Sequence, residues 1–426
     1  MRRIISISLL SVGHACVDVY QGAVASLVPF FVAERAYSYA AVSGMVLAAS
    51  LLSSVVQPVF GVLTDRWAMP WLLPVSTALG GVGIALSGVS GSYGLLLLFV
   101  AISGVGVAAY HPESARIARI AGRGSHSAMG WFSTGGNIGF ALAPLMVGAV
   151  VGVGGLRLTP LLVLPALAGS LLCLPVLRAL GQRQAAGNSV APPGEDDWGS
   201  FMKLSLAVAC RSIVFVGLSA FISLYATQRM GGNATAGTVA LFVLFLGGAV
   251  GSVLGATLAG RWGRVTVAHR AYLASIGSVA GVVFVPGPTM YLFVALTSVG
   301  LYVPFSLQVT LGQDYLPSRV GTASGITLGL AVSVGGLISP AIGTLADATS
   351  LRTALAPLIL MPSVCWLLFR ALPEPPAPHH GTPPASQTDD TDAPPSPAQQ
   401  PDVLRNTGTS PPSGLGVRAT SEPGDT

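Results

Sequence analysis

Long apolar runs alternate with short polar connections along most of the chain. Each run is close to the roughly 20 residues that an α-helix needs to cross a bilayer. Twelve such runs can be drawn, which predicts an all-α integral membrane protein with twelve transmembrane helices. The predicted spans are 5–33, 39–62, 70–89, 93–115, 127–151, 157–178, 203–227, 236–260, 267–286, 290–313, 321–346 and 352–371.

Two polar stretches interrupt this pattern. Residues 181–200 include Pro192-Pro193 and three consecutive acidic residues, which indicates a linker. Residues 373–426 are rich in Pro, Ser, Thr and Asp and have too little apolar content to build a core, so they predict a disordered tail. The predicted domains are an N-terminal six-helix half (1–180), a cytoplasmic central linker (181–200), a C-terminal six-helix half (201–372) and a cytoplasmic tail (373–426).

An internal repeat at a spacing of about 195 residues supports the division into two halves. Its members keep their order along the chain and nearly keep their spacing. The matching pairs are 99–106 with 293–300, Arg66-Trp67 with Arg261-Trp262, Leu156-Arg157 with Leu351-Arg352, and Gly135-Gly136 plus Pro144 with Gly335-Gly336 plus Pro340. A repeat of six spans in parallel orientation is typical of transporters that work by alternating access.

Composition and charge agree with a membrane protein. Hydrophobic residues make up 52% of the chain and charged residues only 9%, whereas soluble domains have about 25% charged residues. In the predicted topology, fourteen of the 21 Lys and Arg residues lie on the side of the membrane that holds the N-terminus. Four lie on the opposite side. This asymmetry predicts that both termini are cytoplasmic, and it explains the net charge of +5 without nucleic-acid binding.

The densest group of charges inside an apolar environment follows the uncharged run 95–109. His111, Glu113, Arg116 and Arg119 all lie within nine residues, and the last three share one side of a helix. A carboxylate at the centre of a membrane helix costs roughly 2.5–3.5 kcal/mol, so such residues mostly face a polar pathway. We therefore predict that Glu113 couples to protons and that His111 lines a wet cavity. The alternative is a local Glu113–Arg116 ion pair that anchors the helix end.

The first span also has a polar stripe. Ser11, His14, Asp18 and Gln21 are spaced by three and four residues, which places them on one side of a helix. Asp18 is the second candidate for proton coupling, while His14 and Gln21 are candidate cavity residues. For His14, a hydrogen bond that packs two helices is an alternative. His14 with Asp18, and the histidine and glutamate of the fourth span, could be combined into a metal site, but no spacing fixes that geometry, so no metal is predicted.

Two further polar residues are candidates for the cavity. Arg211 is the only Lys or Arg of the second half that lies far from the ends of its predicted span. It could meet an anionic substrate, pair with Asp18 across the cavity, or extend along its helix toward the membrane surface. Asn137 lies in the run Gly135-Gly136-Asn137-Ile138-Gly139, whose small residues allow close helix packing.

Two connections carry a motif that a known superfamily shares. Gly61-Val62-Leu63-Thr64-Asp65-Arg66 resembles the loop signature of the major facilitator superfamily, and residues 259–264 form a second copy with Gly260 in place of the acid. In the first copy, residues 68–70 depart from the later part of the signature. The resemblance implies a gate made by charged residues of these loops. The predicted gating residues, including two from the fourth span, are Gly61, Asp65, Arg66, Arg116, Arg119, Arg261 and Arg264.

A closer resemblance covers residues 14–145 most densely. Four segments are similar to the fosmidomycin resistance protein family, a bacterial branch of that superfamily. They are His14–Asp18, Gln57-Pro58, His111–Arg119 and Gly135–Gly139. The last segment, with Ala143-Pro144, also resembles a Gly-Pro motif of antiporters, although close helix packing alone explains it equally well. The family resemblance implies a proton-driven drug exporter of the bacterial inner membrane.

These observations predict a secondary transporter that exports a small molecule in exchange for protons. An importer that uses proton symport is an alternative, and a membrane receptor that kept the fold but lost transport is a second one. The sequence has no nucleophile–base set, metal signature or ATP-binding motif. We therefore predict that the protein is not an enzyme and that it has no cofactor. The predicted partners are a small-molecule substrate, protons and the lipid bilayer, and the predicted oligomeric state is a monomer.

Overall fold

The computed structural model describes residues 3–122, 126–180 and 195–375. Every regular element in these ranges is helical, which agrees with the predicted all-α fold. Most of the predicted central linker and the predicted tail from residue 376 onward lie outside the described residues. The described chain forms one compact unit that ends at Pro375.

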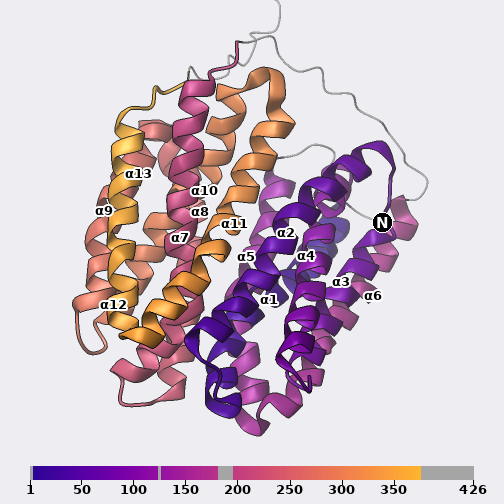
Figure 1. Cartoon of the computed structure of the whole chain (residues 1–426). Helices are drawn as coiled ribbons and strands as arrows, with labels where there is room; N and C mark the ends of the chain where they lie inside the picture. The colour runs from indigo at the N-terminus through magenta and orange to yellow at the C-terminus, as the bar shows by residue number, and fades with distance from the viewer. Residues whose placement is uncertain (1–2, 123–125, 181–194, 376–426) are drawn as a thin grey trace, which may run out of the picture. The chain divides into compact units, whose positions relative to one another are not determined.

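The first half of the chain folds into six long helical segments, which Figure 1 shows as one bundle. The sixth segment is a short 3-10 helix, η1, followed directly by an α-helix. The elements are α1 (Arg3–Arg35), α2 (Tyr39–Arg66), α3 (Leu72–Ser87), α4 (Tyr93–Ala121), α5 (His126–Gly154), η1 (Leu156–Val163) and α6 (Leu164–Leu180).

The second half repeats this arrangement with six more segments, of which the last is broken by a 3-10 turn (Figure 1). The elements are α7 (Trp198–Arg229), α8 (Ala234–Trp262), α9 (Arg264–Phe284), α10 (Met290–Tyr315), η2 (Pro317–Arg319), α11 (Val320–Ala348), α12 (Leu351–Leu355), η3 (Ala356–Ile359) and α13 (Leu360–Arg370). The repeated sequence pairs fall at matching places in the two halves, because Arg66 and Arg261 lie at the ends of α2 and α8 and Leu156 and Leu351 begin η1 and α12.

Polar caps explain where many of these helices begin. Ser38 Oγ accepts a hydrogen bond from Ala41 N at the start of α2, and Ser92 Oγ accepts one from Leu95 N at the start of α4. Asp197 caps α7 in the same way, so this helix begins five residues before the predicted span. Each cap satisfies one N–H that has no partner within the helix.

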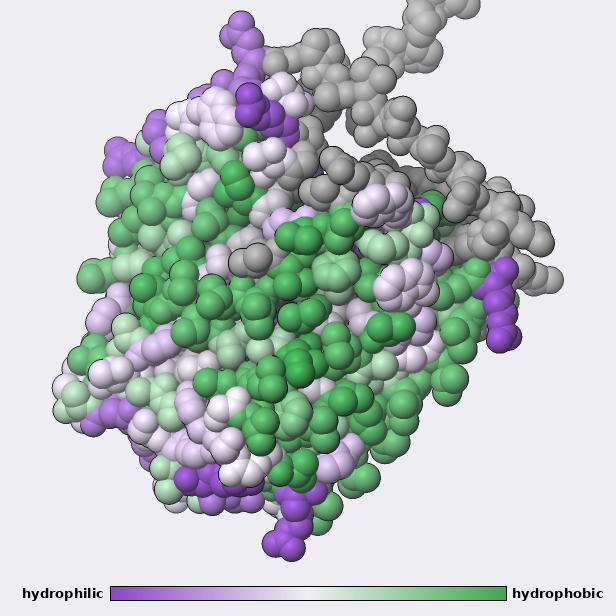
Figure 2. Space-filling model, turned by 45° about the vertical axis from the view of Figure 1, so that its right-hand side comes forward, coloured by the Kyte–Doolittle hydropathy of each residue, from purple (hydrophilic) through white to green (hydrophobic). Residues whose placement is uncertain are grey.

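Eleven described helical segments are long and apolar enough to span a membrane, and α3 is a shorter apolar helix of 16 residues. Large apolar side chains such as Val153, Leu171 and Leu292 are exposed on these helices. Figure 2 shows a broad hydrophobic surface with hydrophilic residues gathered toward its two ends. This is the surface that a multi-pass membrane protein presents to lipid.

Glycines bring α5 against α1 and α11 against α7. A Cβ placed on Gly135 would collide with the carbonyl oxygen of Ser11, and one on Gly335 would collide with that of Ser212. The two collisions involve corresponding glycines of the repeat. Close helix packing is therefore one role of the predicted Gly-Gly segments in both halves.

The two halves touch each other both at the middle of their helices and at one end of the molecule. We call the end at which α1 begins and α13 ends the near face, and the end at which α2 begins and α11 ends the far face. The rings of Phe140 in α5 and Phe245 in α8 lie 4.2 Å apart between their centroids. At the far face, Asp347 of α11 accepts hydrogen bonds from Tyr39 N (2.8 Å) and Ala40 N (2.9 Å).

A side-chain hydrogen bond reinforces this contact, because Gln228 Nε2 of α7 donates to Tyr39 Oη at 2.7 Å. We call Asp347, Gln228 and the first residues of α2 the far latch. In the far latch, the Asp347 carboxylate of the second half binds backbone N–H groups of the first half that have no partner within their helix. A carboxylate at this place also suits the partial positive charge of a helix N-terminus.

Candidate functional site

Three of the predicted site residues meet between α1 and α4. Asp18 Oδ2 lies 3.3 Å from His14 Nε2, one helical turn away, and Asp18 Oδ1 lies 3.1 Å from His111 Nε2. The sequence placed His14 and Asp18 on one side of the first span, whereas it grouped His111 with Glu113. We call His14, Asp18 and His111 the His–Asp–His cluster.

The hydrogen bonds of the two imidazoles determine where their protons lie. His14 Nδ1 is 2.9 Å from the carbonyl oxygen of Phe132, and His111 Nδ1 is 2.7 Å from that of Val107. A carbonyl oxygen only accepts, so both Nδ1 atoms must donate. A neutral ring then has a lone pair on Nε2, and both Nε2 atoms face the Asp18 carboxylate.

The walls of the cluster are packed tightly. The ring of His14 stacks on Phe132 of α5 with centroids 4.2 Å apart, and Tyr110 also lies against His14. A Cβ added to Gly136 would lie 2.5 Å from Asp18 Oδ2 and 2.7 Å from His14 Nε2. Gly136 is thus required for α5 to pass this close to the cluster, which gives the Gly-Gly pair of α5 a second role beside helix packing.

The cluster is more open on one side than on the other. The side chains of His14 and Asp18 are 9% and 13% exposed, and that of His111 is 26% exposed. Asp18 lies about 20 Å along α1 from the near face, at 1.5 Å per residue. A buried carboxylate at this depth with two imidazoles in contact can bind and release a cation or protons from the His111 side.

Glu113 is separated from this cluster on its own helix. Its side chain is fully buried, and both of its oxygens bind Arg116, with Arg116 Nε donating to Oε2 at 2.8 Å and Nη2 to Oε1 at 2.5 Å. This geometry matches the local ion pair that the sequence offered as an alternative. A two-point contact between a guanidinium and a carboxylate fixes the geometry of both groups.

Arg211 occupies an aromatic cage in the other half. Its side chain is buried, and its Nε donates to the carbonyl oxygen of Leu301 at 2.6 Å. The guanidinium carbon lies 4.6 to 5.8 Å from the centroids of three rings, which are Phe215, Tyr302 and Phe305. This arrangement differs from two of the three alternatives from the sequence. The buried side chain does not extend to the membrane surface, and Asp18 contacts the two histidines instead of Arg211.

The second loop motif obtains acidic partners from distant parts of the chain. Arg264 Nη1 lies 2.5 Å from Asp314 Oδ2 in α10 and Arg264 Nε lies 3.7 Å from Glu374 Oε1. Glu374 also caps α9 by accepting from the backbone N–H groups of Arg264 and Val265. Asp314 and Glu374 therefore place two carboxylates beside Arg264. The motif itself has Gly260 at the position of the acid.

The remaining predicted residues are less constrained. Gln21 and Arg261 are exposed and Asn137 is half-buried. A Cβ on Gly61 would meet no described atom within 4 Å, so the close packing expected at this glycine is absent from the described part of the chain in this conformation. The side chains of Asp65, Arg66 and Arg119 lie outside the part of the chain that the structure describes.

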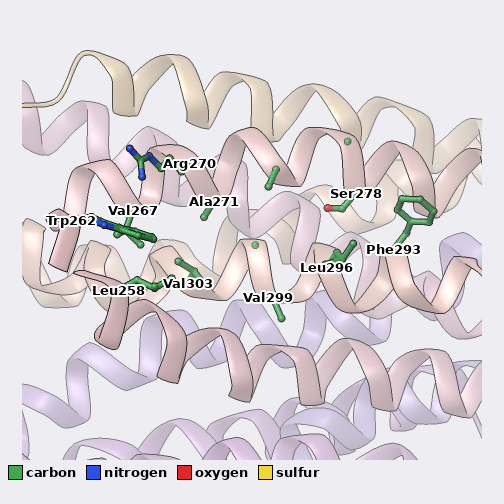
Figure 3. A pocket seen from close by; sticks show the side chains of 13 residues that line it. Leu258, Trp262, Val267, Arg270, Ala271, Ser278, Phe293, Leu296, Val299 and Val303 are labelled. Atoms are coloured by element: carbon green, nitrogen blue, oxygen red, sulfur yellow. The ribbon is translucent and has the colours of Figure 1, made fainter. Parts of the chain in front are cut away.

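An apolar groove of about 390 Å³ lies apart from the cluster, between α8, α9 and α10. Figure 3 shows Arg270 and Trp262 at one end of it and Phe293 and Ser278 at the other. Arg270 is its only charged lining residue in the described chain, and its guanidinium lies over the Trp262 ring. The titratable groups and the apolar groove therefore belong to different halves.

Comparison with known proteins identifies the family. The model of the Major Facilitator Superfamily matches residues 10–340, which is more than three quarters of the chain. The chain belongs to the major facilitator superfamily. Members of this superfamily are membrane transporters of small molecules, which agrees with the predicted two-halved transporter fold.

Two relatives and several solved structures of superfamily members are similar over most of their length. The fosmidomycin resistance protein of Escherichia coli is 28% identical over 358 residues, covering 80% of this chain and 86% of the relative. An uncharacterized MFS-type transporter of Bacillus subtilis, YfnC, is 27% identical and covers 85% and 91%. The predicted resemblance to the fosmidomycin resistance family is therefore confirmed.

Solved structures show the same superfamily fold. A bacterial homolog of the human lysosomal transporter Spinster, in an inward-facing and occupied conformation, has a TM-score of 0.71 at 16% identity and covers 85% of this chain and 95% of its own. The nucleoside transporter NupG (D323A mutant) has a TM-score of 0.72 at 11% identity and covers 86% and 99%. At these identities the likeness concerns the fold alone.

Some residues of the site were not found from the sequence. Phe132 contributes a backbone carbonyl oxygen to the cluster, and Gly136 contributes the space left by its missing side chain. Neither feature can be recognised from the polar residues of the sequence. Asp347 and Asp314 make contacts with residues far away in the chain. Their one visible signal was a lone acid at the end of an otherwise apolar span.

Proposed function

We propose that this chain is a proton-coupled exporter of small organic molecules in a bacterial inner membrane. In this proposal the two halves alternate access to a central cavity, and a proton enters as a substrate molecule leaves. A proton that moves down a potential of about 100 mV gains about 2.3 kcal/mol. That is enough for roughly a fifty-fold gradient of a neutral substrate, at 1.36 kcal/mol per tenfold.

The observation that carries the proposal is the position of Asp18 between two histidines. Because both Nδ1 hydrogens are held by carbonyl oxygens, each contact between Nε2 and Asp18 becomes a hydrogen bond only when a proton lies between them. The cluster therefore has two positions for protons. If the cavity closes over His111 in one state and opens in another, the proton affinity of the His–Asp–His cluster would change together with the access of protons to it.

Asp18 and Glu113 are both retained as coupling residues, with Asp18 as the primary one. A carboxylate that exchanges protons needs partners that can lose their own charge, and imidazoles meet this condition. Arg116 remains charged at any physiological pH and binds Glu113, so Glu113 has no partner that can lose its charge. We propose that Glu113 positions α4, which places His111 opposite Asp18, and that it carries a proton only if Arg116 moves away.

The substrate is proposed to bind between the halves, next to the cluster and the Arg211 cage. His14, Gln21, His111, Asn137 and Arg211 are the proposed lining residues. The cage ring Phe215 lies close to Phe140 and Phe245 of the interface between the halves, and Tyr302 packs edge-on against Phe215. An aromatic wall beside a fixed positive charge suits an organic molecule that has both an apolar part and an anionic group.

We propose that the near face is cytoplasmic, so that both termini lie inside the cell. Lys and Arg residues are more numerous on that side than at the far face, fourteen against four, as the positive-inside rule requires. The far latch then closes the periplasmic side in this conformation. The loop residues Gly61, Asp65, Arg66, Arg116, Arg119, Arg261 and Arg264 would form the opposing gate.

The proposed division of the chain remains two six-helix halves (1–180 and 201–372), a central linker and a tail, which act as a monomer. The contact of Glu374 with α9 attaches the beginning of the proposed tail region to the second half. Transport by one chain needs no partner subunit, because each chain contains both halves and the cavity between them.

The direction of transport can be tested in membrane vesicles. A drug-hypersensitive host that expresses the chain first identifies substrates among antibiotics, with phosphonates included because of the relative's name. The labelled substrate is then offered to everted and right-side-out vesicles with an imposed proton gradient. Export predicts accumulation in everted vesicles only, and its loss when the proton gradient is collapsed. Accumulation in right-side-out vesicles would instead identify a symporter that imports.

A further inference from the structure

The His–Asp–His cluster has the donor set of a metal site. The three candidate ligand atoms, one from each side chain, all lie within 4.8 Å of one another. In a tetrahedral site with bonds of about 2.0–2.1 Å, neighbouring ligand atoms are about 3.3 Å apart. Asp18 Oδ2 lies 3.3 Å from His14 Nε2 and Asp18 Oδ1 lies 3.1 Å from His111 Nε2, so whichever oxygen is the ligand, its distance to one imidazole already matches this value. The remaining separations are at most 4.8 Å, so a small side-chain adjustment completes the tetrahedral geometry.

The outer contacts of both histidines are those of metal ligands. A histidine that binds a metal usually donates its other ring N–H to a carbonyl or carboxylate, which fixes the tautomer and the ring orientation. His14 and His111 both do so, toward Phe132 and Val107. Two rings on different helices are therefore oriented independently so that their lone pairs converge on one carboxylate.

Without a cation the cluster is electrostatically unfavourable. In the neutral tautomers, three acceptor groups face one another with no donor among them. His14 Nε2 and Asp18 Oδ1 are buried and have no hydrogen-bond partner among the described residues. Burial of an unpaired polar atom is costly, so the geometry calls for a positive species between these atoms.

We propose that His14, Asp18 and His111 bind a divalent transition-metal ion of the zinc class. Two imidazoles and one carboxylate suit Zn²⁺, Co²⁺ or Ni²⁺, whereas Mg²⁺ and Ca²⁺ prefer oxygen ligands alone. Three protein ligands leave a fourth position for water, which fits on the more exposed His111 side. The Gly136 backbone closes the opposite side, since a side chain there would overlap two of the ligands.

The proposed function adds one consequence, which rests on it. An ion at this site takes the atoms that coupling assigns to protons. Zn²⁺ in the medium should therefore inhibit export, and it should do so without blocking the far latch. The existence of the site is independent of this consequence, because binding is measured on purified protein without a substrate.

The experiment uses the full chain, purified in detergent with an affinity tag that contains no histidine. The chain has six histidines, and the adjacent pair His379-His380 could chelate a metal by itself. All measurements are therefore made on a His379→Gln/His380→Gln background. Co²⁺ is the probe, because its visible absorption reports both stoichiometry and coordination, and Zn²⁺ is then added to displace it.

Matched variants decide the outcome. We expect one Co²⁺ per chain in the background protein, with affinity at least about tenfold weaker in His111→Gln and in Asp18→Asn. His269→Gln is the control, since His269 stacks on Trp366 in the other half. Its affinity should be unchanged. An equal elution volume in size-exclusion chromatography confirms that each variant is folded.

Two results would overturn the proposal. The first is the absence of Co²⁺ and Zn²⁺ binding to the background protein at millimolar concentration. The second is binding that both cluster variants retain, which would mean an adventitious ion only. If Co²⁺ binds as expected but Asp18→Asn still exports against a proton-driven gradient, the metal site stands and the proposed coupling role of Asp18 fails. The two proposals are thus tested separately.

Discussion

The two halves of this transporter follow one plan but hold opposite charges in their cores. In the first half, two imidazoles contact the Asp18 carboxylate. In the second half, the rings of Phe215 and Phe305 lie against the Arg211 guanidinium. Both charged groups are buried among helices that correspond to each other in the repeat, yet their neighbours differ in chemistry.

The register of the repeat makes this correspondence specific for α1 and α7. Ser11 and Ser212 each place a carbonyl oxygen against the first glycine of a Gly-Gly pair. His14 lies three positions after Ser11, and Phe215 lies three positions after Ser212. A histidine in one half therefore stands where the other half has a phenylalanine.

The same exchange occurs in α4 and α10. The repeated segments end at Gly106 and Gly300, and His111 and Phe305 each follow five positions later. An imidazole can take up a proton or ligate an ion, whereas a phenyl ring can only offer its face to a fixed cation. The comparison assigns exchangeable chemistry to the first half and a permanent charge to the second.

The largest expected effect concerns the Glu113–Arg116 ion pair of α4. Arg116→Gln leaves Glu113 fully buried without a charged partner, which should lower the free energy of unfolding by roughly 3–5 kcal/mol. Thermal unfolding of the purified protein measures the loss. The double variant Glu113→Gln/Arg116→Gln removes both charges and should recover most of the stability. A single variant as stable as the double one would show that the pair is not a structural unit.

A smaller effect is expected in the aromatic cage. Arg211→Lys keeps the charge but loses the planar group that stacks on three rings, so it should cost about 1–2 kcal/mol in thermal unfolding. Arg352→Lys is the control, because Arg352 is exposed and lies over the single ring of Phe284. If Arg211→Lys abolishes proton coupling at normal stability, the division of roles between the halves is wrong.

The smallest predicted effect is a shift between conformations. Asp347→Asn weakens charge-assisted hydrogen bonds that join the halves at the exposed far face, at a cost of about 1 kcal/mol. Spin labels at the far ends of α2 and α11, on a cysteine-free background, should then show a larger population of long distances. Glu34→Gln is the control, because Glu34 caps η1 within one half. The latch is disproved if both variants give the same distance distribution.

The positions of the helices could be predicted from the sequence because each span can be recognised from its own residues. Apolar runs of sufficient length, with Ser, Asn or Asp at their starts, determine where a helix begins without reference to the rest of the chain. The predicted start of the eleventh span, residue 321, differs by one residue from the observed start at Val320. The repeat likewise gave the two halves, since both copies are present in the sequence.

The grouping of the site residues was predicted only in part. Residues two apart on a helix point in nearly opposite directions, so His111 and Glu113 cannot share a site. This rule was available from the sequence, but the partner of His111 was not, because Asp18 lies on another helix 93 positions away. The far latch has the same limit, since Asp347 and Tyr39 meet only after both halves are assembled.

The central claim is that Asp18 in its His–Asp–His cluster holds the coupling proton. The direct test compares Asp18→Asn with the stable double variant Glu113→Gln/Arg116→Gln in proteoliposomes that contain an identified substrate. Ser219→Ala in α7 serves as a control for a buried polar residue outside the cluster. Each liposome sample is assayed for uphill, proton-driven accumulation and for downhill exchange of labelled substrate.

The account predicts that Asp18→Asn reduces uphill accumulation to the level of empty liposomes while downhill exchange continues. The Glu113→Gln/Arg116→Gln protein should still concentrate the substrate because its primary proton site at Asp18 remains, although transport should be slower without a gating residue and the ion pair that positions α4. The opposite pattern, with coupling kept in Asp18→Asn and lost in the double variant, would contradict the account and move the proton to Glu113.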